Sequence, residues 1–283
     1  MPERIPFRLL AVCAALIFIG RGYGYIFWGS PIRVLVWDQD IMEPVVVFFG
    51  SDWEAFAGDL RVDDALSLVT QTIGIYFVLC GLVALAAVRS VRRWFVPLLT
   101  LGAILLLGHA LLEMKDHFYY YAQFFEHAIQ VGTPLLLVGL LRGASADRLL
   151  TTIRIVVALT FAAHGLYAIG FYDVPAHFVN MTMGILGVGE STARTFLWWA
   201  GFLDLIVAVG VFIPRVARWA FAYAVVWGLL TALARVVYGW NFGDVAASVH
   251  GYLYQTVFRL PHGLVPLVGW LMVKCRAHTV KES

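Results

Sequence analysis

Long runs of apolar side chains dominate this sequence and constrain its fold more than any other feature. Spanning the ~30 Å hydrocarbon core of a membrane takes about 20 apolar residues per helix. Eight runs qualify, at about residues 7–28, 65–88, 94–114, 124–141, 150–171, 195–213, 219–238 and 256–273. With 61% hydrophobic and only 13% charged residues, the chain carries more apolar surface than one soluble core could bury. The sequence therefore predicts an all-α polytopic membrane protein with eight transmembrane helices, whose main partner is the lipid bilayer.

The charged residues between these runs predict the orientation of the helices. If the helices alternate in direction, the side of the two termini holds 13 basic and three acidic residues, and the opposite side five basic and twelve acidic ones. Since Lys and Arg are retained on the cytoplasmic side, both termini are expected in the cytoplasm, and the expected location is a bacterial inner membrane. The net charge of +2 and the absence of a basic stripe argue against a nucleic-acid partner.

The loops on the outer side carry apolar and acidic residues in alternation. The longest, 29–62, contains Trp37, Trp53 and Phe56 among its carboxylates, and 172–194 and 239–255 are shorter versions. Such a pattern favours elements that lie in the membrane interface rather than cross it. We expect these loops to cover part of the outer face.

The two halves of the chain resemble each other. Four pairs of segments match: Arg21-Gly22 with His164-Gly165, 90–94 with 215–219, 102–109 with 228–235, and 132–139 with 263–269. This repeat predicts two four-helix bundles, at 1–145 and 146–283. Because four is an even number, both copies enter the membrane in the same direction, which predicts a parallel repeat about an axis along the membrane normal.

The second half also resembles a known family. Arg154, followed after nine residues by His164-Gly165 and then by Tyr167, resembles the first-helix signature of DoxX-like four-helix membrane proteins. The loop with Trp37-Asp38-Gln39-Asp40 after an Arg-Gly-Tyr helix is similar to that of their longer two-unit relatives. That superfamily includes a small subunit of thiosulfate:quinone oxidoreductase, so the resemblance implies the fold and a possible link to quinones.

Ionisable side chains inside the membrane are candidates for a functional site, since each costs several kcal/mol unless it is paired or hydrated. Arg21, His109, His164 and Arg235 fall at one depth in the outer half of the core, counting about 1.5 Å per helical residue. Near them we place Glu113, His127 and Gln130, with Asp204 deeper and His262 near it. We predict that these nine residues, from both halves, line one polar cavity that opens outward.

Three interpretations of this cluster remain open from the sequence. The arginines and histidines suit the carbonyl of a quinone or another small polar ligand, with Glu113 or a histidine moving protons. Imidazole and carboxylate groups also suit a metal, but no spacing matches a metal motif, so no metal site is predicted. Alternatively, pairs such as Arg21 with Glu113, and Asp204 with His164 or Arg235, hold the helices in register.

Three functions correspond to these interpretations. The first is a ligand-binding protein of a membrane redox system, with a redox partner or a second copy of the chain beside it. The second is a non-catalytic subunit or scaffold of a larger complex. Transport of a small solute ranks last, because few polar residues other than Asp204 lie deeper toward the cytoplasmic side. Whether the protein is an enzyme is left open.

Overall fold

The computed structural model describes residues 4–282, with side chains placed from Ile5 to Cys275. All elements in this range are helices: α1 (Arg4–Phe27), α2 (Ile32–Val36), α3 (Gln39–Phe48), α4 (Trp53–Gly58), α5 (Leu60–Ala87), α6 (Phe95–Asp116), α7 (Tyr121–Phe125), α8 (Ala128–Leu141), α9 (Ala146–Ala168), α10 (Ala176–Leu186), α11 (Glu190–Gly210), α12 (Ala217–Gly239), α13 (Val245–Ser248), a π-helical turn (Val249–Leu253), α14 (Tyr254–Arg259) and α15 (Pro261–Glu282). Eight spans are long and apolar enough to cross a membrane, so the predicted all-α polytopic fold is confirmed.

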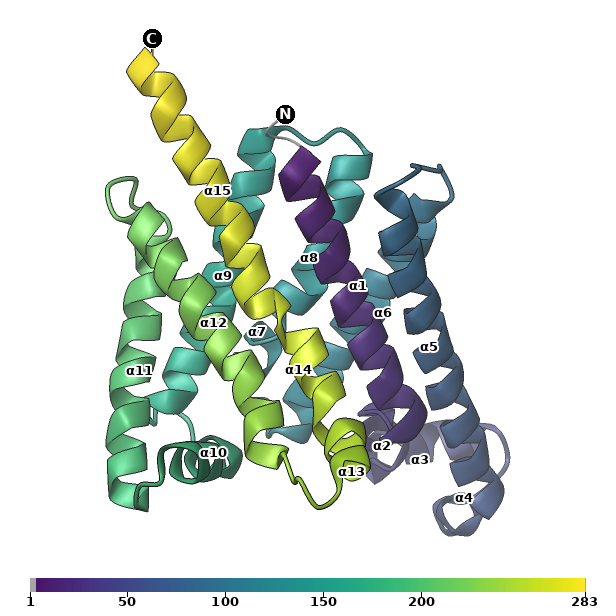
Figure 1. Ribbon diagram of the computed structural model, residues 1–283. Helices are drawn as coiled ribbons and strands as arrows, with labels where there is room; N and C mark the ends of the chain where they lie inside the picture. Colours follow the sequence, from purple (N-terminus) through teal and green to yellow (C-terminus); the bar gives the residue numbers. More distant parts are fainter. Residues whose placement is uncertain (1–3, 283) are drawn as a thin grey trace.

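The described ends of the chain lie at one end of the molecule, and the short helices α2, α3, α4, α10 and α13 lie at the other (Figure 1). Helices α2, α3 and α4 form the long loop after α1, α10 follows α9, and α13 follows α12. These three groups coincide with the segments whose alternating sequence predicted interfacial elements. The end away from the termini is called the outer end below.

Two spans start about five residues earlier than the apolar runs suggested. Helix α5 begins at Leu60 and α11 at Glu190, so the predicted starts at 65 and 195 were too late, and the first loop is correspondingly shorter. Carboxylates occupy the first turns of both helices, Asp63 in α5 and Glu190 in α11. Acidic groups stabilise the positive end of the helix dipole, so these charged residues extend the helix rather than end it.

The first two spans of each half cross at a pair of glycines. A Cβ atom on Gly22 of α1 would lie 2.6 Å from the carbonyl oxygen of Gly74 on α5, and one on Gly165 of α9 would lie 2.8 Å from that of Gly201 on α11. Small residues allow such close backbone contact between membrane helices. Since Gly22 and Gly165 are matched positions of the repeat, the two halves use the same crossing.

The fourth span is interrupted in both halves. Glu126 and His127 separate α7 from α8, and Leu260 separates α14 from α15, just before Pro261. Proline has no N–H to donate and limits the residue before it, which explains the second break. Helices α14 and α15 pack on α1, and α7 and α8 pack on α9, so each broken span fills the centre beside the first helix of the other half.

The long outer loop is attached to the outer end of α6 by an ion pair. The Lys115 ammonium bonds to Asp38, the N-cap of α3, and donates to the Val34 carbonyl oxygen at 3.1 Å. The hydrogen bond from Lys115, aided by the Ile41 N–H, holds the pKa of Asp38 below its ordinary value of 3.8. Because its pKa is lowered, the Asp38 carboxylate stabilises the attachment of the loop to α6 at pH values above 3.8. This contribution is lost as the pH falls through the lowered pKa.

We therefore expect the loop to detach in acid. Pepsin should cleave within residues 32–58 faster in Asp38→Asn than in the wild type at about pH 5, and this difference should narrow as the pH falls toward about 2 and Asp38 takes up a proton. Comparing the two proteins at each pH cancels the pH profile of pepsin itself. A ratio of cleavage rates that stays constant across this range would show that the ion pair does not hold the loop.

Candidate functional site: a cavity open to the bilayer

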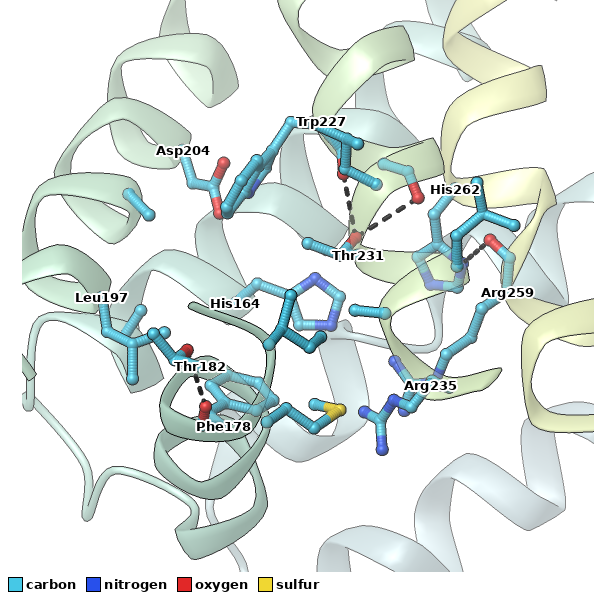
Figure 2. Close-up of a pocket in the computed structure, with 18 of the residues that line it drawn as sticks. His164, Phe178, Thr182, Leu197, Asp204, Trp227, Thr231, Arg235, Arg259 and His262 are labelled. Atoms are coloured by element: carbon cyan, nitrogen blue, oxygen red, sulfur yellow. Dashed lines mark hydrogen bonds between the residues drawn. The ribbon is translucent and has the colours of Figure 1, made fainter. Parts of the chain in front are cut away.

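A cavity of about 480 Å³ lies in the second half of the chain, in the outer part of the membrane region. It is bounded by α9, α10, α11 and α12 and by the junction of α14 with α15 (Figure 2). Helices α11 and α12 diverge toward the outer end, and α10 lies between their outer ends, where it contacts both (Figure 1). The cavity occupies the space that this divergence creates.

Helical periodicity explains which side chains enter the cavity. On α12, Trp227, Thr231 and Arg235 follow i, i+4, i+8 spacing and share one face. The position of these three side chains along the membrane normal is set by the close packing of α12 against α15. At the point of contact a Cβ on Gly228 would lie 2.4 Å from the carbonyl oxygen of His262. The wall is otherwise mostly apolar, with Phe161, Phe178, Met181, Ile185, Phe196 and Leu197 among its members.

The rim of the cavity is apolar and exposed on the membrane side. Leu230, Leu233 and Val237 line the cavity and at the same time belong to an exposed stripe along α12. Phe196 of α11 and Ile185 of α10 are exposed on the facing sides. In a chain that spans a bilayer such side chains face lipid, so the cavity opens sideways into the hydrocarbon.

Two arginines face this apolar cavity without an acidic partner. None of the ion pairs in the part of the chain with placed side chains includes Arg235 or Arg259. The Nε atom of Arg259 is buried and makes no hydrogen bond. Both side chains are half-buried, and a guanidinium that is partly removed from water without an acceptor is costly, so both are suited to a ligand that brings acceptor oxygens.

Two histidines complete the polar wall. The Nδ1–H of His262 donates to the Arg259 carbonyl oxygen at 2.9 Å, which leaves Nε2, buried and unbonded, as an acceptor when the ring is neutral. The ring of His164 lies 5.8 Å from that of His262, centroid to centroid. The cavity thus offers guanidinium donors and an imidazole acceptor along one wall (Figure 2).

Asp204 is the one carboxylate that lines the cavity, and it lies beside the indole of Trp227 (Figure 2). Its Oδ1 atom is buried without a hydrogen bond. The proposed structural pairs of Asp204 with His164 or Arg235 are not among the ion pairs found in the side chains described. Asp204 therefore forms neither of these two pairs, and its side chain is directed at Trp227 of α12.

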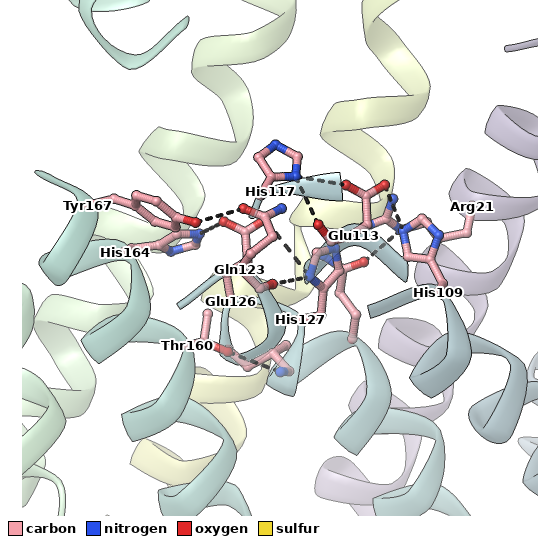
Figure 3. A network of polar contacts seen from close by, with 12 residues as sticks. Arg21, His109, Glu113, His117, Gln123, Glu126, His127, Thr160, His164 and Tyr167 are labelled. Carbon is pink, nitrogen blue, oxygen red and sulfur yellow. Dashed lines mark hydrogen bonds and ion pairs between the residues drawn. The ribbon is translucent and has the colours of Figure 1, made fainter. Parts of the chain in front are cut away.

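A separate polar network lies beside the cavity, built mainly from the first half (Figure 3). The Nε–H of Arg21 donates to Gln130 Oε1 at 2.8 Å, and its guanidinium carbon lies 4.0 Å from the ring centroid of Phe258. The predicted pair of Arg21 with Glu113 does not come within ion-pair distance among these side chains. Arg21 is instead held by an amide and an aromatic face.

Histidines and carboxylates alternate through the rest of the network. On α6, Glu113 lies 3.7 Å from His109 Nε2 and 4.0 Å from His117 Nδ1, as their i, i+4 spacing predicted. Glu126 lies 3.9 Å from His127 Nδ1 and 3.6 Å from His164 Nε2. The carboxylate of Glu126 thus connects the network to the cavity wall.

The nine predicted site residues divide between these two places. His164, Asp204, Arg235 and His262 line the cavity, and Arg21, His109, Glu113, His127 and Gln130 belong to the adjoining network. Two further residues matter that were not among the nine. Arg259 was counted with the outer loops, and Pro261, two residues later, was the signal that a helix break lies beside it. Glu126 falls at the break between α7 and α8, which the sequence did not predict.

The side chains described here contain no group of three or more His, Cys, Asp or Glu residues arranged to hold a metal ion. Comparison of the chain with known protein families, characterised proteins and solved structures finds no match.

Proposed function

We propose that the protein binds a quinone, or another amphiphilic ligand with acceptor oxygens, in the lateral cavity, and that it does so as part of a membrane redox system. The observation that carries this proposal is the presence of two arginines without carboxylate partners on the wall of an apolar cavity that opens to lipid. A ligand of this class reaches such a site from the bilayer, with its apolar part between Phe161, Phe178 and Trp227.

The dimensions and polarity of the cavity suit such a ligand. A volume of about 480 Å³ falls in the range of small-molecule sites, which are mostly apolar with a few polar groups for orientation. Carbonyl oxygens accept hydrogen bonds from Arg235 and Arg259, and the hydroxyl of a reduced ligand suits the Nε2 acceptor of His262. The likeness of the Arg154 to Tyr167 segment to DoxX-like proteins adds to the proposal.

We also propose that the protein resides in a bacterial inner membrane, with both termini in the cytoplasm. The distribution of basic residues, 13 on the side of the termini and five on the other, supports this orientation. The cavity and its network then lie in the leaflet away from the cytoplasm. Because the cavity and the network lie in one leaflet only, they favour ligand binding over transport of a solute across the whole membrane.

Removal of either arginine should weaken ligand binding. For decylubiquinone added to purified protein in nanodiscs, Arg235→Gln and Arg259→Gln should each cost about 2 kcal/mol, the worth of a hydrogen bond to a charged group. This corresponds to an increase in Kd of about 30-fold. Arg194→Gln is the matched control, because Arg194 is exposed on α11 and bonds only to Glu190.

The result that would contradict the proposal is a Kd unchanged from the wild type in both cavity variants. Loss of folding or assembly in these variants, with no ligand bound by the wild type, would favour a non-catalytic subunit or scaffold instead. The tight pairing of Arg21 with Gln130 and Phe258 shows that some of the membrane-embedded polar groups do serve helix packing.

A further inference from the structure

A continuous row of titratable side chains runs from the outer surface to the cavity. It begins at His117, whose side chain is 47% exposed, and passes Glu113 to His109, which is 4% exposed. The rings of His109 and His127 are in edge-to-face contact, with centroids 5.3 Å apart. From His127 the row passes Glu126 and ends at His164, on the cavity wall (Figure 3).

We propose that this row is a proton relay that connects the water at the outer surface with the ligand in the lateral cavity, a step that rests on the proposed binding of a ligand there. The relay consists of His117, Glu113, His109, His127, Glu126 and His164. The cavity mouth faces hydrocarbon, through which a bare proton does not pass, so a bound ligand needs such a route to exchange protons with water.

The chemistry of the row suits proton transfer in both directions. The row is built of imidazole and carboxyl groups, and each takes up a proton at one atom and releases one from another, so its charge is unchanged after the transfer. The net change is the transfer of one proton from water to an oxygen anion of the ligand, which becomes a hydroxyl. Contacts of 3.6 to 4.0 Å are longer than hydrogen bonds, and contacts of this kind commonly shorten when a ligand binds.

The orientation of His127 supports its place in the row. Its Nδ1–H donates to the Gln123 carbonyl oxygen at 2.9 Å, so the Nε2 atom of the neutral ring carries the free lone pair. His109 is fixed in turn by Tyr25, whose hydroxyl lies 3.0 Å from its Nδ1. Each of these two imidazoles thus has one hydrogen-bonded nitrogen. In His127 this same Nδ1 lies 3.9 Å from Glu126, so a proton taken up at Nε2 can leave from Nδ1 toward Glu126.

The charged groups around the row come from every helix packed against it. Arg21 of α1 faces Glu113, His109 and His127, and Asp116 of α6 lies near Glu113. Arg259 and His262, from the α14 and α15 junction, face His127 and His164, and Arg235 of α12 faces His164. Tyr167 of α9 donates to Gln123, which itself donates to Glu126. The two glutamates in the row both lie near the guanidinium of Arg21 and offset its charge, which limits the net charge that protons meet.

The relay can be tested with an amphiphilic pH indicator. We would use 4-heptyl-7-hydroxycoumarin, which has an alkyl tail, a carbonyl and a titratable phenol, and whose fluorescence reports its protonation. Protein in nanodiscs with bound probe is mixed with acid in a stopped-flow instrument. Glu126→Gln should bind the probe as the wild type does but slow its protonation on the order of 100-fold, the usual worth of a positioned proton-transfer group.

Three further variants or conditions complete the test. Glu113→Gln, at the far end of the row and outside the cavity, should slow protonation as Glu126→Gln does. Glu54→Gln, an exposed carboxylate of α4, is the matched control and should leave the rate unchanged. Added formate should restore the rate in Glu126→Gln, because a small acid replaces the lost carboxyl, and this rescue does not occur for a purely structural residue.

The outcomes separate the relay from the binding proposal. Wild-type rates in both Glu126→Gln and Glu113→Gln, with the probe bound, would overturn the relay and leave the binding site intact. Slow protonation that formate does not restore would also overturn it. Failure of the probe to bind to the wild-type protein, or binding that is unaffected in Arg235→Gln and Arg259→Gln, would overturn the binding site and with it the relay.

Discussion

Replacement of Gly201 by leucine is expected to prevent α9 and α11 from packing and to lower the free energy of unfolding by about 3 kcal/mol. A Cβ at this position would lie 2.8 Å from the carbonyl oxygen of Gly165 and 2.8 Å from the Cβ of Ala168. The first neighbour is backbone and cannot rotate away, so the two helices must separate. In a membrane there is little hydrophobic drive to bring them together again, because lipid is as apolar as the side chains.

This effect is measurable as the temperature at which the detergent-solubilised protein loses its monodisperse peak in size-exclusion chromatography. Gly108→Leu is the matched control, since a Cβ on Gly108 of α6 would meet no atom within 4 Å. Gly22→Leu should reproduce the loss seen in Gly201→Leu, because the Gly22 and Gly74 contact is the equivalent crossing in the first half. Equal stability of Gly201→Leu and Gly108→Leu would show that the close crossing is not needed.

Replacement of Ala200 by tryptophan is expected to abolish ligand binding while the protein remains folded. Ala200 lies on α11 and lines the cavity, so the indole has a void to enter rather than a packed neighbour to displace. The Kd for decylubiquinone should rise at least about 100-fold, which corresponds to about 2.7 kcal/mol. The thermal stability of the variant should stay close to that of the wild type.

Leu203→Trp provides the control for this experiment. Leu203 is on the same helix but is exposed on the membrane side, away from the cavity lining. It should bind decylubiquinone as the wild type does. If Ala200→Trp retained the wild-type Kd, the ligand would have to bind elsewhere, and the lateral cavity would lose its proposed role.

Local spacing predicted part of the network correctly. The i, i+4, i+8 spacing of His109, Glu113 and His117 is typical of one stripe on a helix, and Glu113 does lie within 4.0 Å of both histidines. Spacing on one helix determines such contacts, because the helix itself fixes the relative positions of the side chains. The same reasoning applies to Trp227, Thr231 and Arg235 on α12.

Contacts between helices were less predictable. Equal depth in the membrane suggested that Arg21, His109, His164 and Arg235 meet in one place, but depth says nothing about the direction in which each helix face points. In the structure Arg21 turns to Gln130 and Phe258, whereas Arg235 faces the cavity. The suggested pairs of Arg21 with Glu113 and of Asp204 with Arg235 failed for the same reason.

The sequence by itself determined that lipid surrounds the protein and how many helices span the membrane, because apolar length is a property of single helices. Pro261 also marks the break in the last span, whereas the break at Glu126 and His127 was not predicted. Only the tertiary structure decided that α11 and α12 diverge to leave a cavity, and that Glu126 reaches His164 across the two halves. Such features depend on the rotation and tilt of helices against one another, which close backbone contacts such as that of Gly228 with His262 set.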